Sequence, residues 1–231
     1  MTAGMTTRVR RQRRRAACRL ALGAAMGLAA ALTPGGCAAS SAPSAETVSP
    51  GARLERARGF VARARALEHD AERLAEKKPA QASARRREAI ALYRRAVAEV
   101  PDLAEAWNNL GVLLMQEGQF MEAKDAFGIA ADVRPGDPRP LVNTGLLYLE
   151  REWAEPALQY FSRALERDAN NLDALRGATT ASERLGIADE ITLERIRRAL
   201  LIESDPAWVE VFERQRLRVE NQIKSRASAG R

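Results

Sequence analysis

Residues 104–137 read AEAWNNLGVLLMQEGQFMEAKDAFGIAADVRPGD, and residues 138–171 read PRPLVNTGLLYLEREWAEPALQYFSRALERDANN. The two stretches have equal length, and in register Gly111 aligns with Gly145. Each stretch contains two amphipathic helical patterns joined by a short polar connection. A glycine inside a helix costs about 1 kcal/mol relative to alanine. Its occurrence at the same place in both stretches therefore indicates that two helices approach each other closely there.

A period of 34 residues made of two short helices resembles the tetratricopeptide repeat family, and the resemblance implies a right-handed α-solenoid. The matching repeat-packing residues are Trp107, Leu110, Gly111, Ala123, Phe127, Ala130 and Pro135 in the first unit, and Gly145, Tyr148, Ala157, Phe161 and Ala164 in the second. We expect Gly111 and Gly145 to face Ala123 and Ala157. The two phenylalanines would then fill the space between neighbouring repeats.

The repeat pattern continues less regularly on both sides. Residues 52–103 predict a long N-terminal helix and a partial repeat, with an alanine-rich heptad coiled coil as the alternative. Residues 172–205 predict a degenerate repeat, 206–224 a capping helix and 225–231 a disordered tail. The predicted fold class is all-α, with about three to four helix pairs.

The positive charge of the chain is concentrated at its N-terminus. The formal net charge is +7, and residues 1–36 contain seven arginines and no acidic residue. The remainder is electrically balanced, so the composition does not indicate a nucleic-acid partner. Residues 52–100 carry 13 basic and 7 acidic residues, whereas residues 101–170 carry 6 and 12. The basic stretch would either contact anionic lipid headgroups or neutralise the acidic repeats.

Residues 1–36 have the layout of an export signal peptide, with arginines before the apolar run LALGAAMGLAAAL at 20–32. The run is shorter than the about 20 residues of a transmembrane helix. Together with Cys37, the layout resembles the signal of bacterial lipoproteins. The resemblance implies a lipidated Cys37, a flexible tether over 37–51 and, because Ala38 follows the cysteine, an outer-membrane anchor facing the periplasm. Pro34 departs from the pattern, which leaves soluble periplasmic export as the alternative.

The sequence shows no arrangement typical of an active site. The single histidine, His69, lies among charged residues without a cysteine or second histidine as partner. No phosphate-binding loop, HExxH motif or nucleophile elbow occurs. We therefore predict that the protein is not an enzyme and has no cofactor and no metal.

The family resemblance implies a concave groove, lined by the first helix of each repeat, that binds a protein partner. By motif position the partner-binding groove consists of Asn108, Asn109, Val112, Met115, Gln116, Arg139, Val142, Asn143, Leu146, Leu149 and Glu150. At its edges it would include Glu105, Asp173, Arg176, Thr180, Glu183 and Arg184. The family's lysine–asparagine–arginine clamp for chaperone tails is missing, because Leu74, Lys78 and Asn143 occupy its places.

Two features of this groove have alternative explanations. Asn109 and Asn143 are one period apart, and they would either bind a partner's backbone or bond neighbouring helices of the solenoid. The apolar groove residues favour a hydrophobic or amphipathic partner segment, unless one of the chain's own terminal helices covers them.

Together these features predict a protein–protein interaction scaffold of the bacterial cell envelope. Its layout is similar to that of outer-membrane lipoproteins such as pilus pilotins, so a role in assembling an envelope, pilus or secretion complex follows. The alternatives are an accessory or regulatory subunit of a cell-wall or surface-polymer enzyme, or a soluble periplasmic adaptor. Neither the partner nor the oligomeric state is indicated by the sequence.

Overall fold

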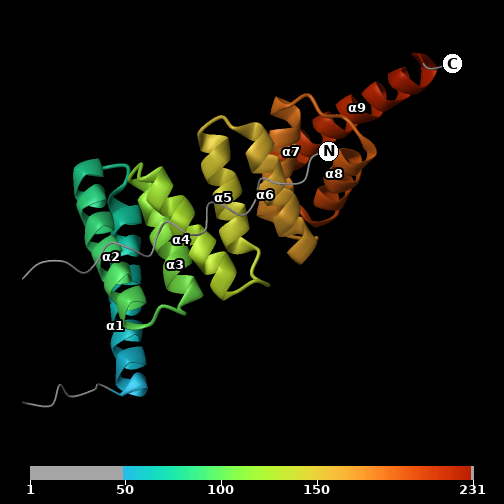
Figure 1. Cartoon of the computed structure of the whole chain (residues 1–231). Coiled ribbons are helices and arrows are strands. Elements are labelled where there is room, and N and C mark those ends of the chain that lie inside the picture. The colour runs from blue at the N-terminus through green and yellow to red at the C-terminus, as the bar shows by residue number, and fades with distance from the viewer. Residues whose placement is uncertain (1–48, 230–231) are drawn as a thin grey trace, which may run out of the picture. The chain divides into compact units, whose positions relative to one another are not determined.

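The computed structural model describes residues 49–229, and within this range it is built from α-helices without strands (Figure 1). The helices are α1 (Pro50–Leu74), α2 (Pro79–Glu99), α3 (Ala104–Gln116), α4 (Phe120–Val133), α5 (Arg139–Glu150), α6 (Ala154–Arg167), α7 (Leu172–Arg184), α8 (Glu190–Ile202) and α9 (Pro206–Ala229). The predicted all-α fold is confirmed. The predicted signal peptide at 1–36, Cys37 and the tether up to residue 48 lie outside the described residues.

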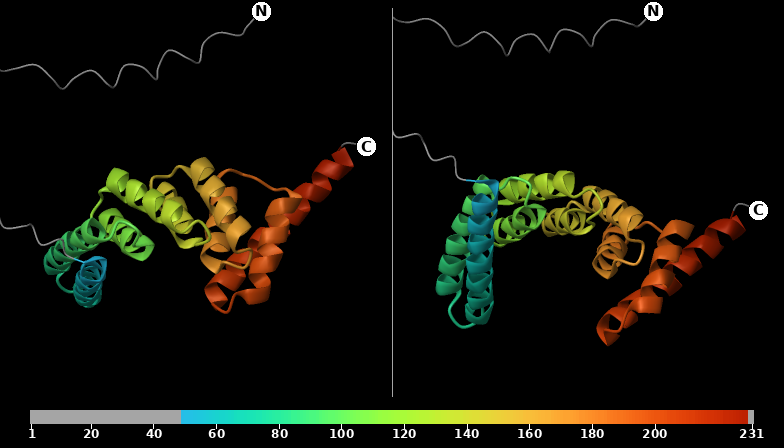
Figure 2. Two further views of the ribbon diagram at one scale, coloured as in Figure 1. Left: turned by 60° about the horizontal axis from the view of Figure 1, so that its bottom comes forward. Right: turned by 90° about the horizontal axis from the view of Figure 1, so that it is seen from below.

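Consecutive helices pack as pairs, and the pairs stack in chain order (Figures 1 and 2). The four pairs are α1–α2, α3–α4, α5–α6 and α7–α8, and α9 packs on α8 at the end of the stack. First helices also contact each other, α3 with α5 and α5 with α7. This is the arrangement of an α-solenoid, in which each unit contacts only its neighbours. None of the described helices combines the length and apolarity needed to cross a bilayer.

Both terminal helices are longer than the sequence predicted. Helix α1 begins at Pro50, inside the predicted tether, because the Ser49 hydroxyl accepts a hydrogen bond from the Ala52 amide (3.3 Å) and a proline is favourable at the first helical position. Helix α9 continues to Ala229, beyond the boundary predicted at 224.

The α1–α2 pair packs through alanines spaced by seven residues. Ala57, Ala64 and Ala71 of α1 are buried, as are Ala82, Ala89 and Ala96 of α2. Small residues at this spacing let two helices approach closely along one seam. The heptad pattern that suggested a coiled coil therefore serves the packing of α1 on α2.

Glycine and phenylalanine form the packing unit of the central repeats. A Cβ atom on Gly111 would lie 2.5 Å from the ring of Phe127, and one on Gly145 would lie 2.6 Å from the ring of Phe161. Both rings are completely buried. The nearest neighbours of the two glycines are therefore the phenylalanine rings, which occupy the space that the missing Cβ leaves.

Phe161 also meets the next repeat, as expected for a residue between repeats. A Cβ on Gly177 of α7 would lie 2.3 Å from its ring. The sequence reasoning did not identify Gly177, because it lies 32 residues after Gly145 and thus outside the 34-residue register.

The turns between paired helices require a left-handed backbone at one position. Gly118 and Gly186 have φ values of +74° and +67°, and Glu152, which lies midway between them in the sequence, has a φ of +61°. The first two positions carry the residue that adopts this conformation most easily, whereas Glu152 adopts it with a side chain.

Replacing Gly111 by alanine should destabilise the fold, because the new methyl group meets a ring that has no free space. We expect a loss of about 1–3 kcal/mol in the free energy of unfolding, measured by urea titration followed by circular dichroism. Gly128→Ala in the exposed interior of α4 is the matched control, since a Cβ there meets nothing within 4 Å. It should gain up to about 1 kcal/mol through helix propensity. Equal effects at both sites would contradict the packing role of Gly111.

Replacing Glu152 by glycine should stabilise the fold. The substitution relieves a left-handed conformation that costs about 1 kcal/mol in a residue with a Cβ, partly offset by the greater backbone entropy of unfolded glycine. The net gain should be a few tenths to about 1 kcal/mol in the same titration. Gly118→Ala introduces the reverse change in the preceding repeat and should destabilise. Destabilisation by Glu152→Gly would show that the glutamate side chain, not its backbone, matters.

Candidate functional site

The predicted groove residues of α3 and α5 differ widely in exposure. Asn108 and Val142 are only 7% and 5% exposed, so they cannot meet a partner, in contrast to what the motif position implied. Five others are half-buried, namely Asn109, Val112, Met115, Asn143 and Leu149. The exposed members are Gln116, Arg139, Leu146 and Glu150.

The groove asparagines form hydrogen bonds between neighbouring helices. The Asn143 amide donates to the Asn108 side-chain oxygen across α5 and α3 (2.9 Å), and the Asn109 amide donates to the Tyr93 hydroxyl of α2 (3.2 Å). The Tyr93 hydroxyl donates in turn to the Glu68 carboxylate of α1 (2.9 Å). Burial raises the pKa of both Tyr93 and Glu68. These asparagines therefore bond neighbouring helices of the solenoid, as the second of the two sequence-based explanations stated.

Arginines of the first pair neutralise carboxylates of the next pair. Arg86 and Arg87 of α2 both contact Glu117, with nitrogen–oxygen distances of 2.6 and 3.2 Å. The Glu117 side chain is only 7% exposed. Arg65 of α1 likewise pairs with Glu105 of α3. Of the two roles considered for the basic stretch, the structure shows the neutralisation of acidic repeat residues.

At the C-terminal end, the concave face is closed by the chain itself. Arg176 of α7 forms a two-pronged contact with Glu203, with nitrogen–oxygen distances of 2.7 and 2.8 Å, and lies over the ring of Trp208 in α9. The hydrogen bonds from Arg176 lower the pKa of Glu203 to about 2. Arg184 donates to the backbone oxygen of Leu149 (2.9 Å). Arg176 and Arg184, which were predicted at the edge of the groove, thus bind other parts of the solenoid.

The centre of the concave face is not covered by either terminal helix. The packing partner of α1 is α2, and the partners of α9 are α8 and α7. Leu146 of α5 lies between them with 39% of its surface exposed. In the described part of the chain, the apolar groove residues around Leu146 therefore face open space, and the alternative of a covering terminal helix is not realised there.

A small hollow deepens the N-terminal end of the same face. It has a volume of about 260 Å³ and lies where α1, α2 and α3 meet. Groove residues Asn109, Val112 and Gln116 line one side of it, and Glu68 and Glu72 of α1 line the other. Arg86 of α2 also lines this hollow, so its polar wall carries charged groups of both signs.

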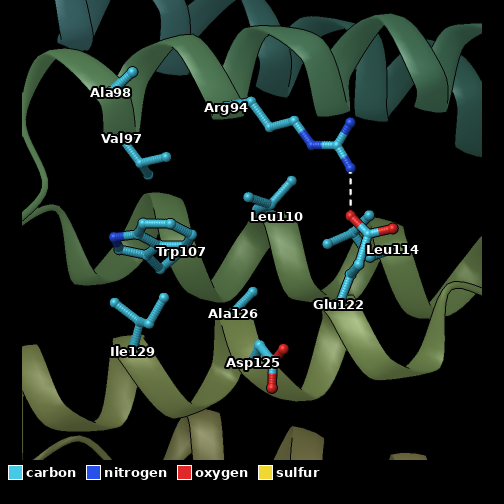
Figure 3. Close-up of a pocket in the computed structure, with 10 residues that line it drawn as sticks. All are labelled: Arg94, Val97, Ala98, Trp107, Leu110, Leu114, Glu122, Asp125, Ala126 and Ile129. Carbon is cyan, nitrogen blue, oxygen red and sulfur yellow. Dashed lines mark hydrogen bonds and ion pairs between the residues drawn. The ribbon is translucent and has the colours of Figure 1, made fainter. Parts of the chain in front are cut away.

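Another hollow lies on the opposite face, between the second helices α2 and α4 (Figure 3). Its volume is about 420 Å³, and Leu110 and Leu114 of α3 lie between the two walls. Trp107 lies at one end, with its indole N–H donating to the backbone oxygen of Pro101 (2.8 Å). At the other end Arg94 and Glu122 form a salt bridge of 2.6 Å across the opening. Hollows on this face were not predicted, because the motif assigned these residues to packing alone.

The described residues show no cluster of three or more histidine, cysteine or acidic side chains that could hold a metal ion. His69 is exposed on α1, as the sequence suggested. The polar contacts described above are structural pairs within the solenoid.

Comparisons with known proteins agree with the fold. A model of the tetratricopeptide repeat family matches residues 74–141. No curated protein sequence gives a match to this chain. Among solved structures, a mutant O-GlcNAc transferase of Thermobaculum terrenum aligns with a TM-score of 0.50 and 20% identity, over 63% of this chain and 26% of that chain.

Two further structures are similar at lower scores. The first tetratricopeptide repeat domain of Spaghetti (RPAP3), bound to an HSP90 peptide, aligns with a TM-score of 0.44 and 17% identity, over 55% of this chain and 96% of that chain. MamA protein aligns with a TM-score of 0.46 and 17% identity, over 66% of this chain and 79% of that chain. The helix pairs, their 34-residue period and the family match at 74–141 all agree with an α-solenoid whose repeats are similar to tetratricopeptide repeats.

Proposed function

We propose that this protein is a non-enzymatic interaction scaffold of the bacterial cell envelope, and that it binds an apolar or amphipathic segment of a protein partner along the concave face of α3 and α5. The observation that carries this proposal is the exposure of Leu146, 39%, at the centre of that face. Leu146 thus differs from the hydrophobic core of the solenoid, whose residues are at most 8% exposed.

The neighbours of Leu146 support an apolar contact. Val112, Met115 and Leu149 are half-buried beside it, while Gln116 and Glu150 form a polar edge. The asparagines that would otherwise bind a peptide backbone are occupied by their own hydrogen bonds. An apolar centre with a polar rim is the anatomy of a protein interface, so side-chain burial, not backbone capture, would supply the binding energy.

The envelope assignment rests on the sequence of the first 37 residues. The arginine-rich start, the short apolar run and Cys37 after two glycines are typical of an exported lipoprotein. A lipid anchor on Cys37 would hold the repeats at the periplasmic face of the outer membrane, where a scaffold could take part in assembling an envelope, pilus or secretion complex.

A charge at the centre of the concave face should abolish partner capture. We expect Leu146→Asp to lose a protein that wild type retains in crosslinked affinity capture from native envelopes, because burying an unpaired carboxylate costs several kcal/mol. Leu201→Asp is the matched control, since Leu201 lies on α8 with 84% exposure. Thermal melts of both variants must match wild type. Equal capture by wild type and Leu146→Asp would show that the partner does not bind at the concave face.

The mature protein should begin with a lipid-modified Cys37. The expected result is a mass of the N-terminal peptide that exceeds the unmodified value by the attached acyl chains, and Cys37→Ser should release the protein from the membrane fraction. An unmodified N-terminus after Ala38 or Ala42 would instead establish a soluble periplasmic form. The scaffold role on the concave face is tested separately and does not depend on this result.

A further inference from the structure

A groove of about 630 Å³ lies between the second helices α6 and α8. Its α6 side extends from Glu155 to Glu166, which corresponds to about 17 Å of helix, or three turns. The opposite side extends from Leu185 to Arg195, through the connection between α7 and α8. The length of this groove suits a segment of another chain better than a single side chain.

The walls of this α6–α8 groove are largely apolar. Leu158 of α6 faces Leu185, Ile187 and Ile191. Leu185, in the turn after α7, is 39% exposed, and Ile191, in the first turn of α8, is 60% exposed. Covering this surface would remove apolar area from water, at a gain of about 25 cal/mol per Å².

Two arginines line the groove, and neither forms an ion pair with a carboxylate in the described part of the chain: Arg163, which lies over the ring of Tyr160, and Arg195. The Arg195 guanidinium is half-buried and donates to the Ser162 hydroxyl (3.0 Å), which itself donates to the Leu158 backbone oxygen (2.7 Å). Its neighbours on α8 are both paired, Arg197 with Glu220 and Arg198 with Glu194. Burial lowers the pKa of Arg195, and the longer-range attraction of Asp189, Glu194 and Glu166 opposes this shift without outweighing it.

The corresponding groove between α2 and α4 contains an ion pair between its two walls. There Arg94 pairs with Glu122 across the opening. In the repeat register Glu122 stands five residues before Phe127, and Ile191 stands five residues before Ile196, the matching residue of α8. In the same register Arg94 of α2 corresponds to Ser162 of α6, so the α6–α8 groove has a serine and an isoleucine where the other groove has an ion pair.

The rim of the α6–α8 groove carries acidic residues at its ends and the exposed Arg163 between them. Glu155 and Glu166 are exposed at the two ends of the α6 wall. Asp189 caps α8 by accepting a hydrogen bond from the Thr192 amide (2.7 Å). Asp189 and Glu166 form no direct ion pair with Arg195 but attract its charge at longer range. The exposed Glu155 and Glu166 favour basic residues at the ends of a segment that occupies the groove.

We propose that the α6–α8 groove binds an amphipathic helical segment of a partner protein, about three turns long, whose apolar stripe contains one acidic residue that pairs with Arg195. The apolar side chains of the segment pack on Leu158, Leu185 and Ile191, and basic residues at its ends meet Glu155 and Glu166. This inference rests on the proposed scaffold function but places a second contact on the face opposite the concave one.

The test uses the full chain and a set of dye-labelled synthetic helical peptides. Each peptide has 14 residues, leucines at helical spacing on one side, lysines at both ends and one glutamate, which occupies a different position of the leucine stripe in each peptide. A matched set carries glutamine instead. Fluorescence anisotropy should show at least one glutamate peptide that binds about tenfold or more tightly than its glutamine partner, as a charge-assisted hydrogen bond requires.

The variants of the protein decide whether Arg195 is responsible. Arg195→Gln should remove the preference for glutamate, whereas Arg198→Gln, which changes the same charge on the same helix, should keep it. Ile191→Lys, at an exposed position, should weaken all peptides alike. Matching thermal melts exclude unfolding as the cause. No saturable binding below about 1 mM by any peptide, or an equal glutamate preference in Arg195→Gln, would overturn the inference.

Two further measurements separate this inference from other outcomes. Leu146→Asp should leave peptide binding at the α6–α8 groove unchanged, so the two faces can fail or succeed independently. Sedimentation of the full chain should show the same oligomeric state for wild type and Arg195→Gln. An oligomer that Arg195→Gln dissociates would make the groove an interface between copies of this chain and would overturn the partner assignment.

Discussion

The contact between a helical glycine and a phenylalanine ring sets the spacing of the central solenoid. With no Cβ on Gly111 or Gly145, the ring of Phe127 or Phe161 lies against the backbone of the first helix, at distances that a methyl group would not allow. Because interiors are packed as densely as crystals, such a contact fixes both the distance and the rotation of the paired helices. The repetition of the contact in the next unit then makes the array regular.

The side-chain bonds between repeats depend on that regular spacing. The Asn143 amide reaches Asn108 one repeat earlier at 2.9 Å, a distance that requires the first helices of neighbouring repeats to be fixed relative to each other. In the first helix pair, Tyr93 stands in place of the phenylalanine. Its hydroxyl donates a hydrogen bond to Glu68 and accepts one from Asn109. A buried hydroxyl without these partners would cost about 1–3 kcal/mol, so the exchange of ring type is tied to the polar residues around it.

The sequence was sufficient to predict the fold but only part of the candidate site. The 34-residue period and the residue types at Gly111 and Phe127 report backbone spacing, which is a property that repeats. Which atom Asn108 or Arg176 contacts depends on neighbours far away in the sequence, and motif position does not carry that information. Gly177 was missed for a related reason. Its place is determined by contact with the Phe161 ring, and it does not align with Gly145 in the 34-residue register.

The arginines of this chain show why an unpaired charge in a groove is informative. An arginine is always ionised and presents a fixed set of donors, so a half-buried one needs acceptors from its surroundings. Arg86 and Arg94 pair with carboxylates of the next helix pair, and Arg176 pairs with Glu203 in the connection before α9. These ion pairs tie neighbouring units together. Arg195 is half-buried and donates to the Ser162 hydroxyl, and Asp189, Glu194 and Glu166 act on its charge only at longer range. Because Arg195 forms no ion pair within the described residues, it retains donors that a carboxylate of another molecule can accept.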